Sequence, residues 1–284
     1  MKHWMIVVMC VALGACEQVV SLELPEGAEQ LVVEARVQRI KGSNSGEQSI
    51  RLTTTDAYFS DSAPPPARGA TVRVIDEAGR TFILAESAFI PGLYGTVSLR
   101  AEIGRRYTLQ IDYHGERYEA SETLLATPPI DRLYFAPQNT LAGPGTSEGV
   151  RATIDFLEPG GARNYYLWDQ YVNNERMISS YSEFPVRVIG SDEGRDGRAV
   201  SGWQPYDGKD VPSGADVIVR QMSLSEAGYR YYRALSDQSA NDGSPFAVPL
   251  ASVRSNIANI TNPKHRPLGY FIATEVSEAR ARVP

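Results

Sequence analysis

The chain has 284 residues, 42% of them hydrophobic and 9% aromatic, and a formal net charge of −6 at pH 7. This length suits one or two globular domains with a sizeable core. A mildly acidic chain without a basic run is poorly suited to nucleic acid, where neutralised phosphates supply most of the affinity. It is equally poorly suited to electrostatic attraction by acidic lipids. We therefore expect no nucleic-acid partner.

The N-terminal segment predicts export and a lipid anchor. Lys2 precedes an apolar run from Trp4 to Leu13, and small residues follow before Cys16, which is the order of a secretory signal. The run is too short for a bilayer core of about 30 Å, which takes roughly 20 residues. Leu13-Gly14-Ala15-Cys16 resembles the lipobox of bacterial lipoproteins. The resemblance implies removal of signal residues 1–15 and covalent lipid on Cys16. The alternative is an ordinary signal peptide or membrane anchor with a chance cysteine.

Residues 16–29 are predicted to form an acidic tether. Glu17 directly after the lipid-bearing cysteine resembles signals that send some lipoproteins to the outer face of the outer membrane. We expect a lipid-anchored protein of the outer membrane, on its periplasmic or surface side, with the surface favoured. The second cysteine, Cys10, lies in the signal, so the mature chain has no disulfide and must depend on its core.

Residues 30–127 show the alternation of a β-sandwich. Leu31–Val37 places apolar side chains on one face at every second position, as a half-buried strand requires. Ala70–Leu84 predicts one hairpin. Tyr107–Tyr113 and Glu116–Glu122 predict another, through the turn His114-Gly115, because glycine accepts positive φ. Several short strands and no helix predict an antiparallel sandwich, immunoglobulin-like or prealbumin-like.

Residues 128–284 are predicted to form a second β domain, which begins after a proline-stiffened boundary at Thr127–Asp131. We expect an antiparallel β-sandwich or a barrel-like domain. Asn164–Val172 is apolar on both faces, which is typical of a strand buried on both sides. One helix is expected near 224–239, with Ser223 and Glu226 as a capping box and a stripe of Leu224, Ala227, Tyr231 and Leu235 against the sheet. The fold class is therefore mainly β.

A series of short motifs in a shared order carries a family resemblance. After the lipobox come Leu31-Val32-Val33-Glu34, Pro64-Pro65-Pro66, Pro91-Gly92-Leu93-Tyr94, Pro128-Pro129-Ile130-Asp131, Asn164-Tyr165-Tyr166-Leu167, Tyr231-Tyr232-Arg233-Ala234-Leu235 and Leu268-Gly269-Tyr270-Phe271. The chain resembles the domain-of-unknown-function family 4249, lipoproteins of Bacteroidota. The resemblance implies an outer-membrane lipoprotein, often encoded near TonB-dependent transporters. It implies no established activity, so no catalytic residue is carried over.

The sequence shows no catalytic or metal motif. His114 and His265 lie in no HExxH context, and no GxSxG is present. Asp192, Glu193 and Asp196 could offer oxygens to calcium, but their spacing matches no standard loop, and a solvated hairpin tip is the favoured interpretation. We expect no catalytic residue, no metal and no cofactor beyond the covalent lipid.

Trp203 and Tyr206 form the one candidate binding surface. Large aromatic residues in a Gly/Pro/Ser loop can stack on a sugar or a peptide, or they can plug the open end of the second domain, which is the favoured alternative. The leading function is a non-catalytic binding or accessory lipoprotein that works with a TonB-dependent transporter and meets a glycan or peptide ligand. The alternative is a structural or envelope-assembly lipoprotein with protein contacts only. A carbohydrate-active hydrolase is third, because paired acids can be far apart in sequence.

Overall fold

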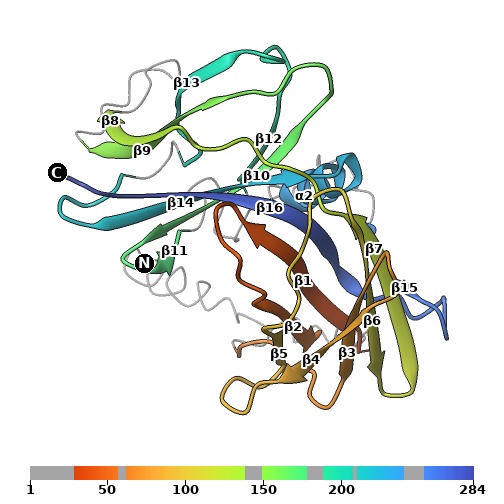
Figure 1. The fold of residues 1–284 in the computed structure, drawn as a ribbon. Coiled ribbons are helices and arrows are strands. Elements are labelled where there is room, and N and C mark those ends of the chain that lie inside the picture. Colours follow the sequence, from red (N-terminus) through yellow and green to blue (C-terminus); the bar gives the residue numbers. More distant parts are fainter. Residues whose placement is uncertain (1–28, 57–61, 138–148, 178–187, 207–209, 240–252) are drawn as a thin grey trace, which may run out of the picture.

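The computed structural model describes residues 29–56, 62–137, 149–177, 188–206, 210–239 and 253–284 (Figure 1). The expected class is confirmed: the chain is mainly β, with large antiparallel sheets and one helix in the described residues. Those sheets do not close on themselves, so the second half is a sandwich and not the barrel-like alternative. Cys16, the signal and the tether up to residue 28 lie outside the described residues.

Thirteen strands form one long sheet, and three form a second, smaller sheet. The first half contains β1 (Leu31–Ile40), β2 (Gln48–Thr54), β3 (Thr71–Asp76), β4 (Thr81–Glu86), β5 (Leu93–Thr96), β6 (Arg106–Tyr113) and β7 (Glu116–Thr123). The second half contains β8 (Arg132–Pro137), β9 (Val150–Leu157), β10 (Tyr165–Val172), β11 (Glu175–Arg176), β12 (Val188–Ser191), β13 (Ala199–Trp203), β14 (Asp216–Leu224), α2 (Glu226–Ser239), β15 (Ala258–Asn259) and β16 (Leu268–Arg282).

The last strand joins the two halves. β16 pairs in parallel with β1, from Val32 opposite Leu268 to Ile40 opposite Val276, and antiparallel with β14 along its second part (Figure 1). A parallel pair of this kind needs a long connection, here almost the whole chain. The closing strand therefore belongs to the first sandwich as much as to the second half.

The first core follows the predicted alternation. Leu31, Val33, Ala35 and Val37 are all buried and pack with side chains from β2, β3, β6 and β7. β4 pairs with both β3 and β5, which carries the sheet from one layer of the sandwich to the other. The period-two pattern thus marks the buried face of this half correctly.

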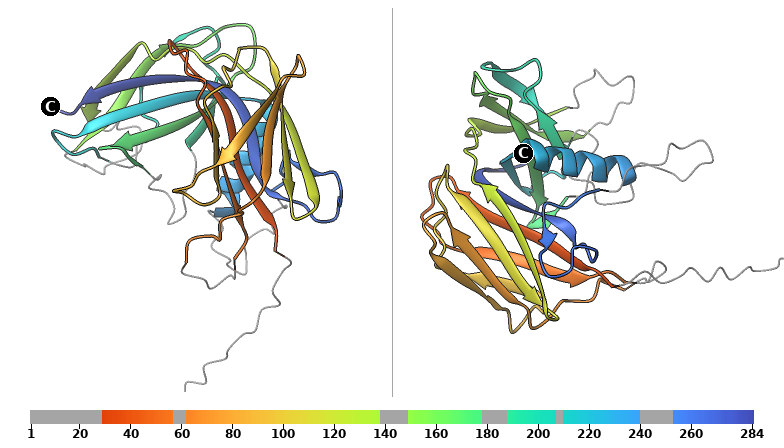
Figure 2. Two further views of the ribbon diagram at one scale, coloured as in Figure 1. Left: turned by 60° about the horizontal axis from the view of Figure 1, so that its bottom comes forward. Right: turned by 90° about the vertical axis from the view of Figure 1, so that its right-hand side faces the viewer.

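The second core lies between the small sheet β13-β9-β8 and the strands β10 and β14. Tyr166 and Trp168 face this core, whereas Tyr165 and Leu167 face a third cluster under α2. The prediction that this strand is buried on both faces is confirmed. The right-hand view of Figure 2 shows α2 beside the long sheet where the two halves meet.

The helix begins later than its expected cap. The backbone amide of Gly228 donates to Ser225 Oγ (3.1 Å), so Ser225 is the N-cap; Ser223 belongs to β14 and donates to the Ala126 carbonyl oxygen. The expected Ser223–Glu226 capping box is wrong. Ala227 is exposed and Gly228 is buried in its place. β14 therefore continues through Leu224, the residue at which the helix was expected to begin.

The connection between the halves is not an exposed linker. Thr127 and Pro128 are buried, and the connection runs beside β16, where Leu125 forms a parallel bridge with Thr274. The amide of Thr127 donates to Glu275 Oε2 (3.1 Å), and the amide of Ile130 donates to Ser277 Oγ (2.8 Å). The division into domains at this point stays a prediction, because the cores are separate while the long sheet runs through both.

Candidate binding site

The two aromatic residues singled out from the sequence lie at the second core. Tyr206 is 5% exposed, and its hydroxyl donates to the carbonyl oxygen of Trp168 (3.3 Å). Trp203 is half-buried, with its ring centroid 5.5 Å from that of Trp168 and the Arg195 guanidinium 4.7 Å from its own centroid. A register shift between Val200 and Trp203 turns this ring inward. The geometry is that of the core plug and not of an open stacking platform.

The acidic turn between β12 and β13 holds the backbone of the neighbouring β9–β10 connection. Asp192 is 3% exposed; its Oδ2 accepts the amide of Asn164 (2.9 Å), and its Oδ1 lies 3.5 Å from Arg163 Nε. Asp196 Oδ1 accepts the amide of Gly161 (2.9 Å). Within the described residues no three His, Cys, Asp or Glu side chains gather as metal ligands would. Asp192 is therefore part of a buried loop junction, whereas Glu193 is exposed as a hairpin tip would be.

Two carboxyl groups have the raised pKa of a general acid, and the sequence pointed to neither. Burial raises the pKa of Glu158, which accepts bonds from the Tyr166 hydroxyl (2.6 Å) and the Asn164 amide (3.0 Å). Burial also raises the pKa of Glu122, which accepts bonds from Tyr270 and Ser225. The two groups lie in different halves of the chain. Each is surrounded by protein donors, which is the arrangement of a structural polar centre.

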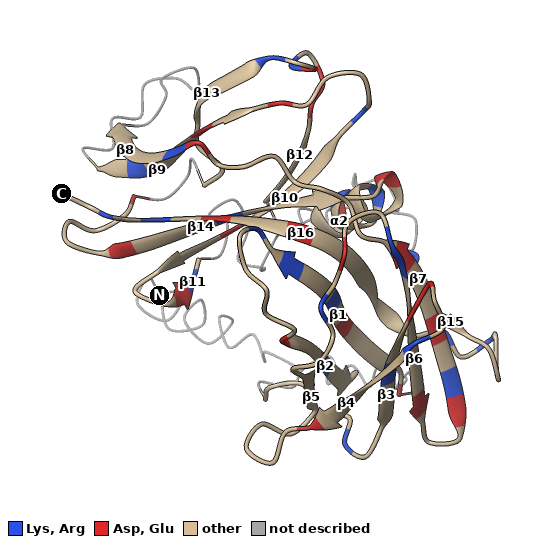
Figure 3. Ribbon diagram, in the orientation of Figure 1, with Lys and Arg blue, Asp and Glu red and all other residues tan. Residues whose placement is uncertain are grey.

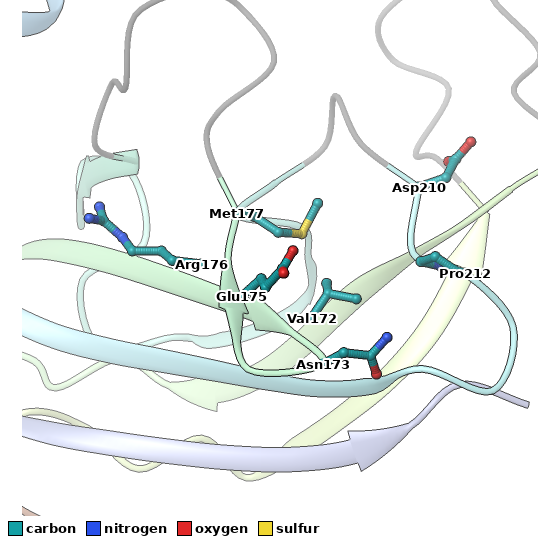
Figure 4. Close-up of a pocket in the computed structure, with 7 residues that line it drawn as sticks. All are labelled: Val172, Asn173, Glu175, Arg176, Met177, Asp210 and Pro212. Atoms are coloured by element: carbon teal, nitrogen blue, oxygen red, sulfur yellow. The ribbon is translucent and has the colours of Figure 1, made fainter. Parts of the chain in front are cut away.

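One open pocket of the described residues lies at the β10–β11 turn (Figure 4), and another of similar size, about 340 Å³, lies between the Gly161–Arg163 and Asp192–Asp196 loops. The volume of the first pocket is about 350 Å³, and it is lined by Val172, Asn173, Glu175, Arg176, Met177, Asp210 and Pro212. The β10–β11 turn supplies most of this lining. Asn173 and Asn174 both have positive φ (50° and 68°), so they make a two-residue turn between β10 and β11.

Two charged side chains of this pocket form ion pairs with buried residues of opposite charge. Arg176 lies 3.2 Å from the buried carboxylate of Asp169, and Asp210 lies 3.1 Å from the buried guanidinium of Arg151. Glu175 is exposed, and Val172, Met177 and Pro212 supply apolar surface. Elsewhere, charges of both signs are interspersed along the strands (Figure 3). The pocket can thus offer both signs of charge and an apolar wall to one ligand.

The pocket and the start of β1 lie at opposite ends of the long sheet. β1 begins at Leu31, and the next residue, Val32, lies opposite Leu268 at the start of β16. Val172 lies opposite Val217, which lies opposite Ala281 near the end of β16. At about 3.3 Å per residue, the strand between these points is about 40 Å long. The pocket therefore lies at the far end of β16 from the point where β1 begins.

Comparison with known proteins decides the family. The sequence profile described as "Domain of unknown function (DUF4249)" matches residues 17–280, nearly the whole chain. The chain belongs to the DUF4249 family. No curated protein matches this DUF4249 chain.

Two of the solved structures that match resemble the DUF4249 chain distantly. One is a DUF4785 family protein from Legionella pneumophila, with 9% identity, a TM-score of 0.22 and coverage of 68% of this chain. The alignment spans 52% of that protein, about half its length. Another is CBD12 from CALX1.2, with 10% identity, a TM-score of 0.18 and coverage of 89% of this chain and 100% of the other. Scores this low carry no argument about function.

Proposed function

We propose that this DUF4249 chain is a lipid-anchored, non-catalytic binding or accessory protein of the outer membrane that works with a TonB-dependent transporter. The observation that carries the proposal is the open pocket about 40 Å along β16 from the start of the chain's first strand. Such a protein presents its ligand site away from its anchor, where a transporter can receive the ligand. No helix of the described residues is long and apolar enough to cross a bilayer. Covalent lipid on Cys16 supplies the attachment in this proposal.

A short peptide is the ligand class that this pocket favours over a glycan. The lining combines Glu175 and Asp210 with Arg176, next to the apolar side chains of Val172 and Met177. Peptide termini and side chains carry both signs of charge, which such a lining complements. Glycan sites usually place an aromatic ring against the sugar, and the described residues of this lining include none.

Lipidation and partner capture are tested separately. Cys16→Ser should abolish incorporation of labelled palmitate and leave an uncleaved or mislocalised precursor; unchanged labelling would show that the anchor is elsewhere. The lipidated protein is then used to capture partners from detergent-solubilised outer membrane, which are identified by mass spectrometry. A TonB-dependent transporter is the expected partner. Capture of envelope-assembly proteins alone would favour the structural alternative.

A charge reversal at the pocket tests the ligand. Glu175→Arg alters the exposed acidic wall, and Glu77→Arg, an exposed glutamate at a hairpin turn of the first sandwich, is the matched control. A tetrapeptide library and a set of malto-oligosaccharides serve as probes, read by mass spectrometry after gel filtration. We expect peptide retention by the wild type and by Glu77→Arg, and its loss in Glu175→Arg. Retention of saccharides alone, or equal retention by both variants, contradicts the proposed site.

A further inference from the structure

The loops at one end of the first sandwich expose large apolar side chains. Phe89 is 94% exposed and Ile90 is 47% exposed in the connection between β4 and β5. They are the one consecutive pair among the exposed large hydrophobic residues of the described chain. Single exposed apolar residues are ordinary on a protein surface, whereas a neighbouring pair on a loop tip marks a candidate contact.

The loop that carries this pair is built by hydrogen bonds. Ser87 Oγ accepts the amides of Phe89 (3.3 Å) and Ile90 (3.1 Å), and Glu86 accepts the amide of Gly92 (3.2 Å). Gly92 has φ +73°, and a Cβ there would lie 2.4 Å from the Leu52 carbonyl oxygen. Phe89 is thus presented outward by a defined turn.

Strand registers place this loop at the end where the chain enters the fold. The amide of Leu52 donates to the Gly92 carbonyl oxygen, and Leu52 lies opposite Val33, two residues into β1. The amide of Ile260 donates to the carbonyl of Arg117, next to the β6–β7 turn, and Leu268 lies opposite Val32. Ile260 and Leu268 are 54% and 39% exposed. Four exposed apolar side chains therefore lie at the end of the sandwich where β1 begins.

The entry point itself is held to the sandwich. His265 Nε2 lies 2.6 Å from the carbonyl oxygen of Glu29, and His265 Nδ1 lies 2.8 Å from the carboxylate of Glu116 at the start of β7. The direction in which the chain leaves β1 is therefore set by a contact with β7. Residues 16–28, which precede this point, span at most about 45 Å when fully extended.

We propose that this end of the first sandwich, with Phe89 and Ile90 at its tip, is a membrane-contact surface that seats on the lipid bilayer. The choice of a bilayer as the occupant rests on the proposed lipid at Cys16. The tether from that lipid joins the fold at the end where β1 begins, so this end can reach the bilayer, and the apolar pair lies at that end. Exposed basic residues there, Arg68, Lys264 and Arg266, can place their charges among the headgroups while the apolar side chains insert. Because the whole chain is acidic, insertion and not charge supplies the affinity.

The cysteine content makes a site-specific test available. The mature chain has the single cysteine Cys16, so Phe89→Cys introduces a second thiol at the loop tip. The matched control is Val97→Cys, because Val97 is 81% exposed and lies beyond Thr96, at the opposite end of the same sandwich. Each lipidated variant is labelled with an environment-sensitive fluorophore and reconstituted in phosphatidylethanolamine/phosphatidylglycerol vesicles. We expect a blue shift and quenching by brominated lipid at position 89 and neither at position 97. An aqueous signal at position 89 overturns the proposal.

A second measurement separates this surface from the anchor. The mature chain with Cys16→Ser carries no lipid, and its co-sedimentation with the same vesicles is compared with that of Phe89→Glu/Ile90→Glu and of Val97→Glu on that background. We expect a loss of roughly tenfold in partitioning for the double change only, and little effect of salt. Equal partitioning of all three proteins overturns the proposal. A blue shift at position 89 that appears without vesicles and grows with protein concentration also overturns it, because the occupant would then be a second copy of the chain. Reaction of the fluorophore with Cys16 in the wild type would show a free thiol and so refute the lipid anchor. The co-sedimentation measurement would still test the membrane-contact surface.

Discussion

His265 Nδ1 lies 2.8 Å from Glu116 Oε2, while His265 Nε2 lies 2.6 Å from the carbonyl oxygen of Glu29. Both partners accept hydrogen bonds, and a neutral imidazole has one N–H to donate. The charged imidazolium alone satisfies both contacts. The contact that holds Glu29, two residues before β1, therefore depends on the protonation of His265.

This coupling predicts how stability depends on pH. The bond to the Glu29 carbonyl and then the bond to Glu116 raise the pKa of His265 above 6.5, so its contribution is complete below pH 6.5 and is lost as pH rises through the folded pKa. The Tyr118 hydroxyl, with His265, Asn259 and Asn262, lowers the pKa of Glu116 from 4.5 to about 2, so its contribution is present above pH 4.5 and is lost as pH falls towards 2. These two groups together favour the fold most between about pH 4.5 and 6.5.

The measurement is the melting temperature of wild type and His265→Gln from pH 3 to 9. The difference between the two proteins should be largest below pH 6.5 and should shrink at higher pH, once the wild-type histidine is neutral. The neighbouring charged groups, Lys264 and the carboxylate of Glu29, are present in both proteins, so they do not contribute to the difference. A constant difference over the whole range would show that the charge of His265 contributes nothing.

The aromatic pair at the second core gives a stability prediction. Tyr206→Ala and Trp203→Ala should each lower the free energy of unfolding by about 3 kcal/mol or more, because they open a cavity beside Trp168. Phe89→Ala, at a side chain 94% exposed, should change it little. Urea denaturation compares the three variants. A Trp203→Ala/Tyr206→Ala double variant that keeps wild-type stability but no longer binds the ligand would restore the surface interpretation of these two residues.

Thr127 predicts that the connection between the halves is rigid. Its Oγ1 donates to the Glu275 carbonyl oxygen (2.5 Å) and accepts the amide of Ser223 (2.9 Å), and all three residues are buried. Thr127→Val keeps the shape and leaves buried polar groups unpaired, so it should cost about 1–3 kcal/mol. Thr81→Val, at an exposed strand position, is the control. Rapid proteolytic cleavage at Thr127–Asp131 in the wild type would contradict this rigidity.

Two glycines should respond to alanine with opposite signs. A Cβ at Gly228 in α2 would meet Ser225 Oγ at 3.4 Å and Tyr270 at 3.5 Å, which is ordinary contact, so Gly228→Ala should stabilise the fold by about 0.5–1 kcal/mol. Gly269 has φ +95°, and a Cβ there would lie 1.9 Å from the Val33 carbonyl oxygen. Gly269→Ala should therefore unfold the protein or cause a large fall in its melting temperature. Calorimetry of both variants decides the point, and a neutral Gly269→Ala would refute the close approach of β1 and β16.

The sequence by itself determined the family, the β class, most strands and the His114-Gly115 turn. These features are local: alternate burial repeats every two residues, and a two-residue turn depends on its own φ values. The tertiary structure alone decided which strands lie side by side. Nothing in Leu31–Val37 or Leu268–Val276 announces a parallel pair, because the same alternation fits either direction and the partners are far apart in the chain. Only the tertiary structure shows that Tyr206 is buried and that a pocket lies beside Glu175, because burial depends on packing across strands and not on composition.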